Sequence, residues 1–257
     1  MKRFCRACLM CAMVLTLLCG CSQDFAGAYE DAVELFAQGD YAQAAHAFDR
    51  LGDFANAATY AAYSWGLTYY NQGDYATALA YFANARGFMY GEERYQYCLG
   101  DTLERAGSYG EAAQAYALIP GFEDADQRYQ YCLGCVAQQA SDASAALNAY
   151  ALAGNYGDAA DRLLDLQVEI YTQARQKKAQ GDYAGASELF LLLGDYHDSA
   201  SEALACQDIY REALYAQAEE LEAAGDLQGA YERFKSLEGY NDAGARASDL
   251  AQRLGLE

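Results

Sequence analysis

The amino-acid sequence predicts an all-α protein, an α-solenoid of about six helix-turn-helix repeats that ends in a C-terminal capping helix. The first observation is an internal repeat, because the heptapeptide Arg94–Gly100 recurs unchanged as Arg128–Gly134, 34 residues further on. The second is a Gly-Asp-Tyr turn that returns along the chain, and the third is the presence of one proline in 257 residues. A fixed period of this length is typical of stacked helical hairpins.

Each predicted repeat is centred on one turn. The turns lie at Gly39, Gly73, Gly107, Ser141, Gly181 and Gly225. Glycine suits the left-handed residue that ends a helix, and the Asp or Ser that follows it can cap the next helix. Ser108 and Glu111 also have the spacing of a capping box. We therefore predict one helix on each side of every turn.

Small and aromatic residues stand at fixed distances from these turns. Seven positions before them lie Ala32, Gly66, Gly100, Gly134, Ala174 and Ala218. Five positions after them lie Ala44, Ala78, Ala112, Ala146, Ala186 and Ala230, and nine positions after them lie Phe48, Phe82, Tyr116, Tyr150, Phe190 and Phe234. Small residues opposite rings allow two antiparallel helices to approach and interlock.

A second kind of turn separates one helix pair from the next. It carries a glycine, then an aromatic residue, then a residue of the type that caps helices, namely Asn56, Asp124, Asp158, Asp198 and Asp242. Tyr90 breaks this rule at the second junction. Beyond the last turn, residues 242–254 have the apolar spacing of one more amphipathic helix, which can cap the array.

The last two repeats are longer than the others, and the extra residues fall in one place. From the capping residue to the tyrosine ten positions before the turn, the distance is seven residues in Asn56–Tyr63, 13 in Asp158–Tyr171 and 17 in Asp198–Tyr215. Neither insertion contains Gly or Pro, so we predict that the first helix of each long repeat gains six or ten residues.

Charge and residue type exclude several classes of function. The chain has 37 acidic and 17 basic side chains and a formal charge of −20, which opposes electrostatic binding to nucleic acid or to an anionic membrane. The two histidines, His46 and His197, lie in different repeats, so no metal site is expected. Cys132 and Cys135 lie inside a predicted helix, which favours packing over a redox role. We find no phosphate-binding loop or nucleophile elbow, and we expect no cofactor, no small-molecule substrate and no enzyme activity.

The repeats resemble divergent tetratricopeptide or Sel1-like repeats. The resemblance rests on the 34-residue hairpins and on the small residue, the Gly-Asp-Tyr turn, the alanine and the ring at their offsets, and it covers about residues 25–241. It implies a right-handed solenoid whose first helices line a concave groove. The proline that usually ends such a repeat is replaced by a glycine-containing turn, Pro120 lies elsewhere, and Ser141 replaces one turn glycine.

A ladder of tyrosines lies ten positions before the turns, at Tyr29, Tyr63, Tyr97, Tyr131, Tyr171 and Tyr215. The resemblance implies that these rings face the groove, and the predicted groove set also includes Tyr70, Arg94 and Arg128. Tyrosine offers a large contact area with few rotatable bonds. Two interpretations stay open, packing between adjacent first helices and contact with a ligand. Residues four and seven positions after each tyrosine differ between repeats, which either a peptide-binding surface or neutral drift can produce.

The N-terminus resembles the signal peptide of a bacterial lipoprotein. Three basic residues precede an apolar run over residues 8–18, which is too short to span a membrane. Leu18–Cys21 resembles a lipobox, with Cys19 as a departure from the usual residue types, and implies removal of residues 1–20 and lipidation of Cys21. The mature chain would then carry 14 basic and 37 acidic side chains, a formal charge of −23. Ordinary signal-peptide cleavage, which would give a secreted protein, is the alternative.

The predicted organisation is a signal peptide over residues 1–20, a repeat array over residues 21–241 anchored through Cys21, and a capping helix and tail over residues 242–257. We expect an extracytoplasmic scaffold at the outer face of the cell membrane, which binds an unknown protein or peptide in its groove. One alternative is a component of a cell-envelope assembly complex, similar to the tetratricopeptide lipoprotein of the outer-membrane β-barrel insertion machinery. Another is an accessory to an enzyme, or an enzyme itself.

Overall fold

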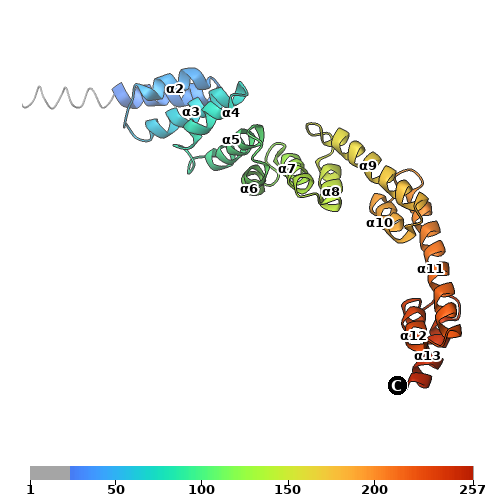
Figure 1. Ribbon diagram of the computed structural model, residues 1–257. Coiled ribbons are helices and arrows are strands. Elements are labelled where there is room, and N and C mark those ends of the chain that lie inside the picture. Colours follow the sequence, from blue (N-terminus) through green and yellow to red (C-terminus); the bar gives the residue numbers. More distant parts are fainter. Residues whose placement is uncertain (1–23, 257) are drawn as a thin grey trace, which may run out of the picture. The chain divides into compact units, whose positions relative to one another are not determined.

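The computed structural model describes residues 24–256, which form helices joined by short turns (Figure 1). No strand occurs within these residues, so the predicted all-α class is confirmed. The described residues form two compact units, residues 24–159 and residues 160–256. The predicted signal peptide and Cys21 lie outside the described residues.

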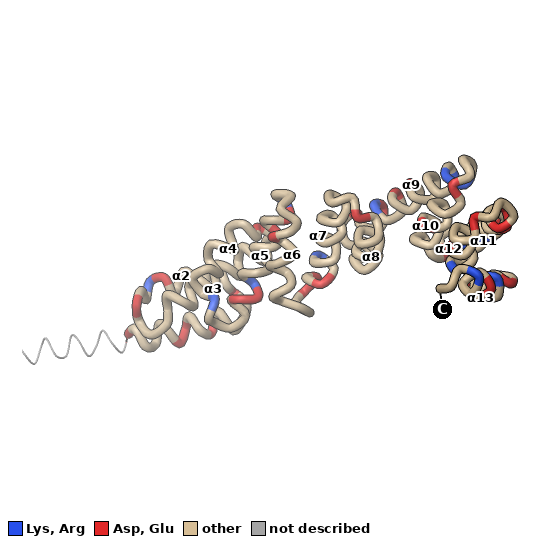
Figure 2. The backbone as a smooth tube through the Cα atoms, turned by 60° about the horizontal axis from the view of Figure 1, so that its bottom comes forward, with Lys and Arg blue, Asp and Glu red and all other residues tan. Residues whose placement is uncertain are grey.

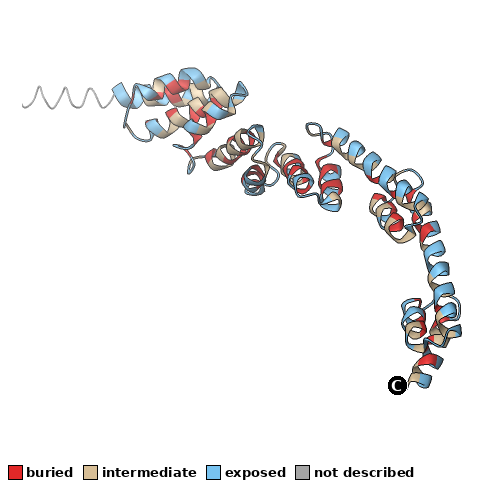
Figure 3. Cartoon of the chain, in the orientation of Figure 1, coloured by how far each residue is buried: buried red, intermediate tan, exposed pale blue. Residues whose placement is uncertain are grey.

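Four helix pairs make up the first unit. A helix over residues 24–37 pairs with α2 (Tyr41–Asp49), and the next pairs are α3 (Ala57–Asn71) with α4 (Tyr75–Phe82), α5 (Gly91–Arg105) with α6 (Tyr109–Ala117), and α7 (Ala125–Gln139) with α8 (Ala143–Ala153). Each helix packs against the next one along the chain, as a solenoid requires. The buried residues follow the faces where these helices meet (Figure 3).

The second unit begins within α9 and repeats the same pairing. Its helices are α9 (Ala159–Ala179), α10 (Tyr183–Leu193), α11 (Ser199–Ala223), α12 (Leu227–Ser236) and α13 (Ala243–Leu254). The amphipathic helix expected over residues 242–254 is present as α13. Its Ala243, Ala247 and Leu250 are buried in one cluster with Phe234 of α12, so this helix covers the apolar face that the last pair would otherwise expose.

The predicted lengthening of two first helices is confirmed. Helices α3, α5 and α7 have 15 residues each, whereas α9 has 21 and α11 has 25. The differences are the six and ten residues that the insertions add. Both long helices are exposed over much of their length (Figure 3), and their added turns carry exposed apolar residues such as Leu164, Val168 and Leu204.

The interlock between small residues and rings is also confirmed. A Cβ atom added to Gly100 would lie 2.5 Å from the ring of Tyr116, and the same distance separates Gly66 from Phe82 and Gly134 from Tyr150. All six rings at this repeat position are at most 1% exposed, and the six alanines five positions after the turns are fully buried. Each helix pair is therefore held at a distance that only a small residue permits.

The turns within the helix pairs are left-handed, as predicted. The five turn glycines have φ between 76° and 85°, and Ser141 adopts a φ of 59° in place of a sixth glycine. The following acid accepts a bond from a backbone N–H in four of six pairs, at Asp74, Asp142, Asp182 and Asp226. The predicted capping box is wrong, because the side chain of Ser108 makes no capping bond. In the first pair the side chain of Asp40 makes no capping bond either, and it accepts a hydrogen bond from the side chain of Gln43.

Replacing Gly100 by Ala is expected to lower the free energy of unfolding by about 1–3 kcal/mol, because the new methyl group must displace the Tyr116 ring. Gly110 is a matched control in the neighbouring helix α6, since no atom lies within 4 Å of a Cβ added there. Gly110→Ala should raise the free energy of unfolding by about 0.5–1 kcal/mol. Urea denaturation measures both effects, and changes of the same sign would contradict the close approach at Gly100.

Candidate functional site

The six ladder tyrosines lie where one repeat meets the next. Each ring contacts the buried ring of its own repeat, with centroids 5.4–6.3 Å apart. Tyr63, Tyr97 and Tyr131 are 3%, 4% and 8% exposed, and the other three are half-buried. These rings are thus part of the packing between repeats, which was one of the two interpretations of the ladder.

Five ladder hydroxyls donate a hydrogen bond to the residue 27 positions later, which begins the first helix of the next repeat. The O–O distances are 2.6 Å for Tyr97–Asp124, 2.8 Å for Tyr131–Asp158 and 2.6 Å for Tyr171–Asp198, and the same bond joins Tyr29 to Asn56 and Tyr215 to Asp242. Tyr63 is the exception, because Tyr90 occupies the acceptor position. We call these bonds the tyrosine ties.

The tyrosine ties correct the expected role of the acceptor residues. Asn56, Asp124, Asp198 and Asp242 were predicted to cap their own helices, but none of these side chains makes a capping hydrogen bond. Each accepts from the ladder tyrosine of the preceding repeat instead. A carboxylate engaged by a phenol in this way joins two repeats, whereas a cap would stabilise only one helix.

The protonation states suit these bonds. Burial and then the hydrogen bond to Asp124 raise the pKa of Tyr97 above its ordinary value of 10.0, so its hydroxyl remains a donor. The hydrogen bond from Tyr171 is the main cause that lowers the pKa of Asp198 below its ordinary value of 3.8. At neutral pH the Tyr171–Asp198 tie therefore joins a neutral phenol to an ionised carboxylate.

Residues seven positions after the ladder tyrosines pair with residues 24 positions later. The pairs are Phe36–Tyr60, with ring centroids 5.5 Å apart; Tyr70–Arg94, with the guanidinium 4.8 Å from the ring centroid; Glu104–Arg128 at 3.4 Å; Lys178–Glu202; and Glu222–Arg246 at 2.7 Å. The chemistry varies between junctions, from a ring pair to a cation over a ring to ion pairs of either order, yet each pair is complementary. At these five positions, a change of residue type in one repeat is therefore accompanied by a complementary residue in the next repeat.

Arg128, one of the predicted groove residues, is the centre of a buried charge cluster. Its guanidinium lies 3.0 Å from Asp101, 3.4 Å from Glu104 and 2.8 Å from Asp124, and it donates to the Tyr116 hydroxyl at 3.1 Å. The side chain of Arg128 is 11% exposed and that of Asp101 is 6% exposed. Charges this deeply buried need their partners, so Arg128 is committed to the fold.

Arg94 occupies the same repeat position as Arg128 but has different surroundings. Its guanidinium lies 4.8 Å from the ring centroid of Tyr70 and 5.8 Å from that of Phe122. Within residues 24–256 it forms no ion pair, because the two buried acidic positions beside Arg128 are held here by Leu67 and Tyr70. Its Nε is buried without a hydrogen-bond partner. Tyr70 and Arg94 were both predicted to line the groove, and the structure brings them into contact. The positive charge of Arg94 is not neutralised by a carboxylate within residues 24–256.

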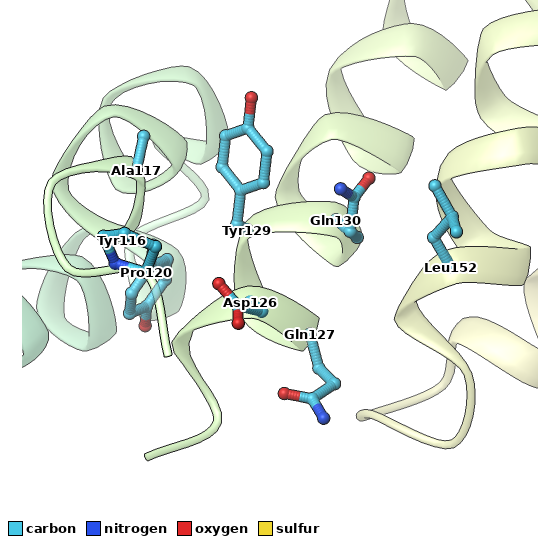
Figure 4. Close-up of a pocket in the computed structure, with 8 residues that line it drawn as sticks. All are labelled: Tyr116, Ala117, Pro120, Asp126, Gln127, Tyr129, Gln130 and Leu152. Carbon is cyan, nitrogen blue, oxygen red and sulfur yellow. The ribbon is translucent and has the colours of Figure 1, made fainter. Parts of the chain in front are cut away.

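A pocket of about 460 Å³ opens between α6, α7 and α8 of the first unit. Figure 4 shows its lining residues, Tyr116, Ala117, Pro120, Asp126, Gln127, Tyr129, Gln130 and Leu152. Asp126, Tyr129 and Gln130 project from the first turns of α7, with Pro120 on the α6 side. Sequence reasoning missed this pocket, and the sole proline of the chain was its only sign.

The cysteines have the environment of packing residues. Cys98, Cys132 and Cys206 are fully buried and Cys135 is 3% exposed. Burial raises the pKa of Cys98 and of Cys132 to about 12, so these thiols stay protonated. In the described part of the chain, no group of three or more His, Cys, Asp or Glu side chains is placed to hold a metal ion. None of the described helices is long and apolar enough to cross a membrane.

The chain matches no protein-family model, and no curated protein matches it. The helical-repeat architecture therefore rests on the recurrence of the turns, the ring interlock and the tyrosine ties.

Tyr171→Phe is expected to reduce the loss of stability at acidic pH. The folded pKa of Asp198 is lowered by Tyr171, so the stabilisation is present above the unfolded value of 3.8 and is lost as the pH falls through the folded value. Urea denaturation at about pH 6 and about pH 3 should therefore show a smaller difference for the variant than for the parent. Tyr63→Phe is the control, because no acid lies at its acceptor position, and it should keep the pH dependence of the parent. The same change in both variants would contradict the tie.

Proposed function

We propose that the protein is a lipid-anchored, extracytoplasmic scaffold of tetratricopeptide-like repeats that binds another protein and catalyses no reaction. The lipobox-like segment ending at Cys21 supports the anchor, since two acyl chains hold a protein at a membrane without a spanning helix. The repeated helix pairs support the scaffold, because stacked hairpins provide extended surfaces for protein partners. The tetratricopeptide resemblance places the binding surface along the first helices.

The observation that carries this proposal is the availability of Arg94. The chain has 37 acidic and 17 basic side chains, and the copy of Arg94 one repeat later, Arg128, contacts three carboxylates. Arg94 instead lies over the rings of Tyr70 and Phe122 and forms no ion pair within residues 24–256. A guanidinium held over a ring has lost part of its freedom already, so a partner carboxylate can bind it at a low entropic cost. A protein segment that presents a carboxylate is the ligand we assign to Tyr70 and Arg94.

The ladder tyrosines have a supporting role in this proposal. Five of the six hydroxyls are engaged in the tyrosine ties, so these residues hold the repeats in register beneath the binding surface, and the edges of the ladder rings supply its apolar contacts. The acid excess extends over the helices of both units (Figure 2). Long-range attraction therefore favours partners with basic surfaces, and binding should weaken as salt is added.

A photoreactive amino acid at Tyr70 tests the binding surface in the native membrane. We expect a crosslink to a protein partner, and we expect Arg94→Gln to reduce it about ten-fold or more, since a charge-assisted contact is lost. A photoreactive amino acid at Ser108, in the turn of the next repeat, is the matched control and should not crosslink. A crosslink at Tyr70 that is unchanged by Arg94→Gln would remove Arg94 from the site.

Cys21→Ala is expected to abolish both incorporation of an alkyne-labelled fatty acid and recovery of the full-length chain in the membrane fraction. The thiol of Cys21 is the proposed attachment point, and without acyl chains the acidic array has no affinity for the bilayer. Cys19→Ala is the matched control, because it removes a cysteine two positions away and should leave both readouts intact. Labelling that survives in the Cys21 variant would contradict the anchor.

A further inference from the structure

The pocket between α6, α7 and α8 has a filled copy one repeat earlier. The residues 34 positions before Pro120, Asp126, Tyr129 and Gln130 are Arg86, Glu92, Tyr95 and Gln96. Three of the four positions keep their chemistry, a carboxylate, a phenol and an amide. Only the first changes, from arginine to proline.

In the filled copy the side chain of Arg86 lies against the carboxylate and the phenol ring, and the amide supports the carboxylate. Its Nε and Nη2 donate to the two carboxylate oxygens of Glu92 at 2.7 and 2.8 Å, and its guanidinium lies 4.3 Å from the ring centroid of Tyr95. The amide of Gln96 donates to the same carboxylate at 2.8 Å. The hydrogen bond from Arg86 is the main cause that lowers the pKa of Glu92. A planar cation is thus recognised by a two-pronged bond and a ring face.

In the open copy the same groups lack a cation. Proline cannot supply one, and a pocket of about 460 Å³ remains in front of Asp126, Tyr129 and Gln130 (Figure 4). Asp126 is exposed, and its Oδ2 accepts from the backbone N–H of Gly121 at 3.1 Å, while its Oδ1 has no partner within residues 24–256. Gln96 is 6% exposed in the filled copy, whereas Gln130 is only partly buried.

We propose that the open copy, a guanidinium cradle formed by Asp126, Tyr129 and Gln130, binds an arginine side chain of a partner protein. The chain itself provides the precedent, because its own arginine occupies the equivalent place one repeat earlier. The formal charge of −20 attracts a basic segment to this surface. Lysine fits less well, because an ammonium group cannot make the two parallel bonds that the planar guanidinium makes.

The difference between Glu92 and Asp126 is consistent with a ligand from outside. The carboxylate of Asp126 lies one methylene closer to its helix than that of Glu92. Arg86 belongs to the turn before α5, so the position of its backbone limits how near its guanidinium can come to that helix. An arginine of a partner protein is not limited in this way and can come close enough to α7 to reach the shorter side chain of Asp126. The source of this arginine in a partner rests on the proposed function, but recognition of a guanidinium by the cradle does not.

NMR titration of the full chain with N-acetylarginine amide tests the cradle directly. The backbone amide signals of Asp126, Tyr129 and Gln130 should shift and approach saturation. N-acetyllysine amide at the same concentration should give shifts that are at least about five-fold smaller. Asp126→Asn should abolish the response to arginine. Equal shifts with the two probes, or shifts spread over the acidic surface without saturation, would overturn the proposal.

Two variants use the repeat as its own control. Pro120→Arg should fill the cradle from within and remove the response of residues 126–130 to the arginine probe. Arg86→Ala should empty the first copy, so that Glu92, Tyr95 and Gln96 respond to the probe in addition. Full binding by the Pro120→Arg variant would overturn the proposal. If the arginine probe does not bind but the crosslink at Tyr70 is found, the cradle proposal is wrong and the scaffold function stands. If the probe binds but no crosslink at Tyr70 is found, only the scaffold function is overturned.

Discussion

The contact between one small residue and one buried ring inside each helix pair is the constraint on which the other contacts depend. At Gly100 a single added carbon would lie 2.5 Å from the Tyr116 ring, so this ring packs directly on the backbone of the neighbouring helix. The ring held in this way supports the ladder tyrosine of its own repeat, as Tyr116 supports Tyr97 at 6.1 Å. The hydroxyl of Tyr97 then donates a hydrogen bond to Asp124, the residue at which the next repeat begins. Close packing within one pair thus fixes the register between pairs.

Helix lengths could be predicted from the sequence, whereas the turns between repeats could not. The insertions before Tyr171 and Tyr215 contain no helix breaker, so their residues could only extend a helix already begun. In contrast, the residue before the N-cap position at each junction has a left-handed backbone, whether or not a tie follows it, and only one of the six is glycine: Ala55, Met89, Glu123, Gly157, His197 and Asn241. Sequence reasoning expects glycine at such positions. Met89 has this backbone beside Tyr90, which accepts no tie, so the conformation does not depend on the tie, and no local residue type predicts it.

The predicted groove set shows the same limit at single residues. Arg94 and Arg128 stand in identical heptapeptides, so local sequence assigns them one role. Their roles differ because of the residues 24 and 27 positions earlier. For Arg128 these are Glu104 and Asp101, which form ion pairs with it, whereas for Arg94 they are Tyr70 and Leu67, which cannot. Comparison of each residue with its partner in the preceding repeat would have separated the two from sequence alone. The pocket beside Pro120 is likewise visible only when one repeat is compared with its neighbour.

The junction pairs also constrain the order of the repeats. In the first unit the acid Glu104 precedes the base Arg128, whereas in the second unit the base Lys178 precedes the acid Glu202. A repeat that begins with the helix of Glu202 could not follow the repeat of Glu104, because two carboxylates would then meet in a partly buried interface. The aromatic pair Phe36–Tyr60 would likewise lose its ring contact if a carboxylate replaced either member. Charge therefore separates the Lys178–Glu202 junction from the two in which a glutamate precedes an arginine, Glu104–Arg128 and Glu222–Arg246. Unmatched positions such as Arg94 and the cradle beside Pro120 are then the places where the chain can recognise something other than itself.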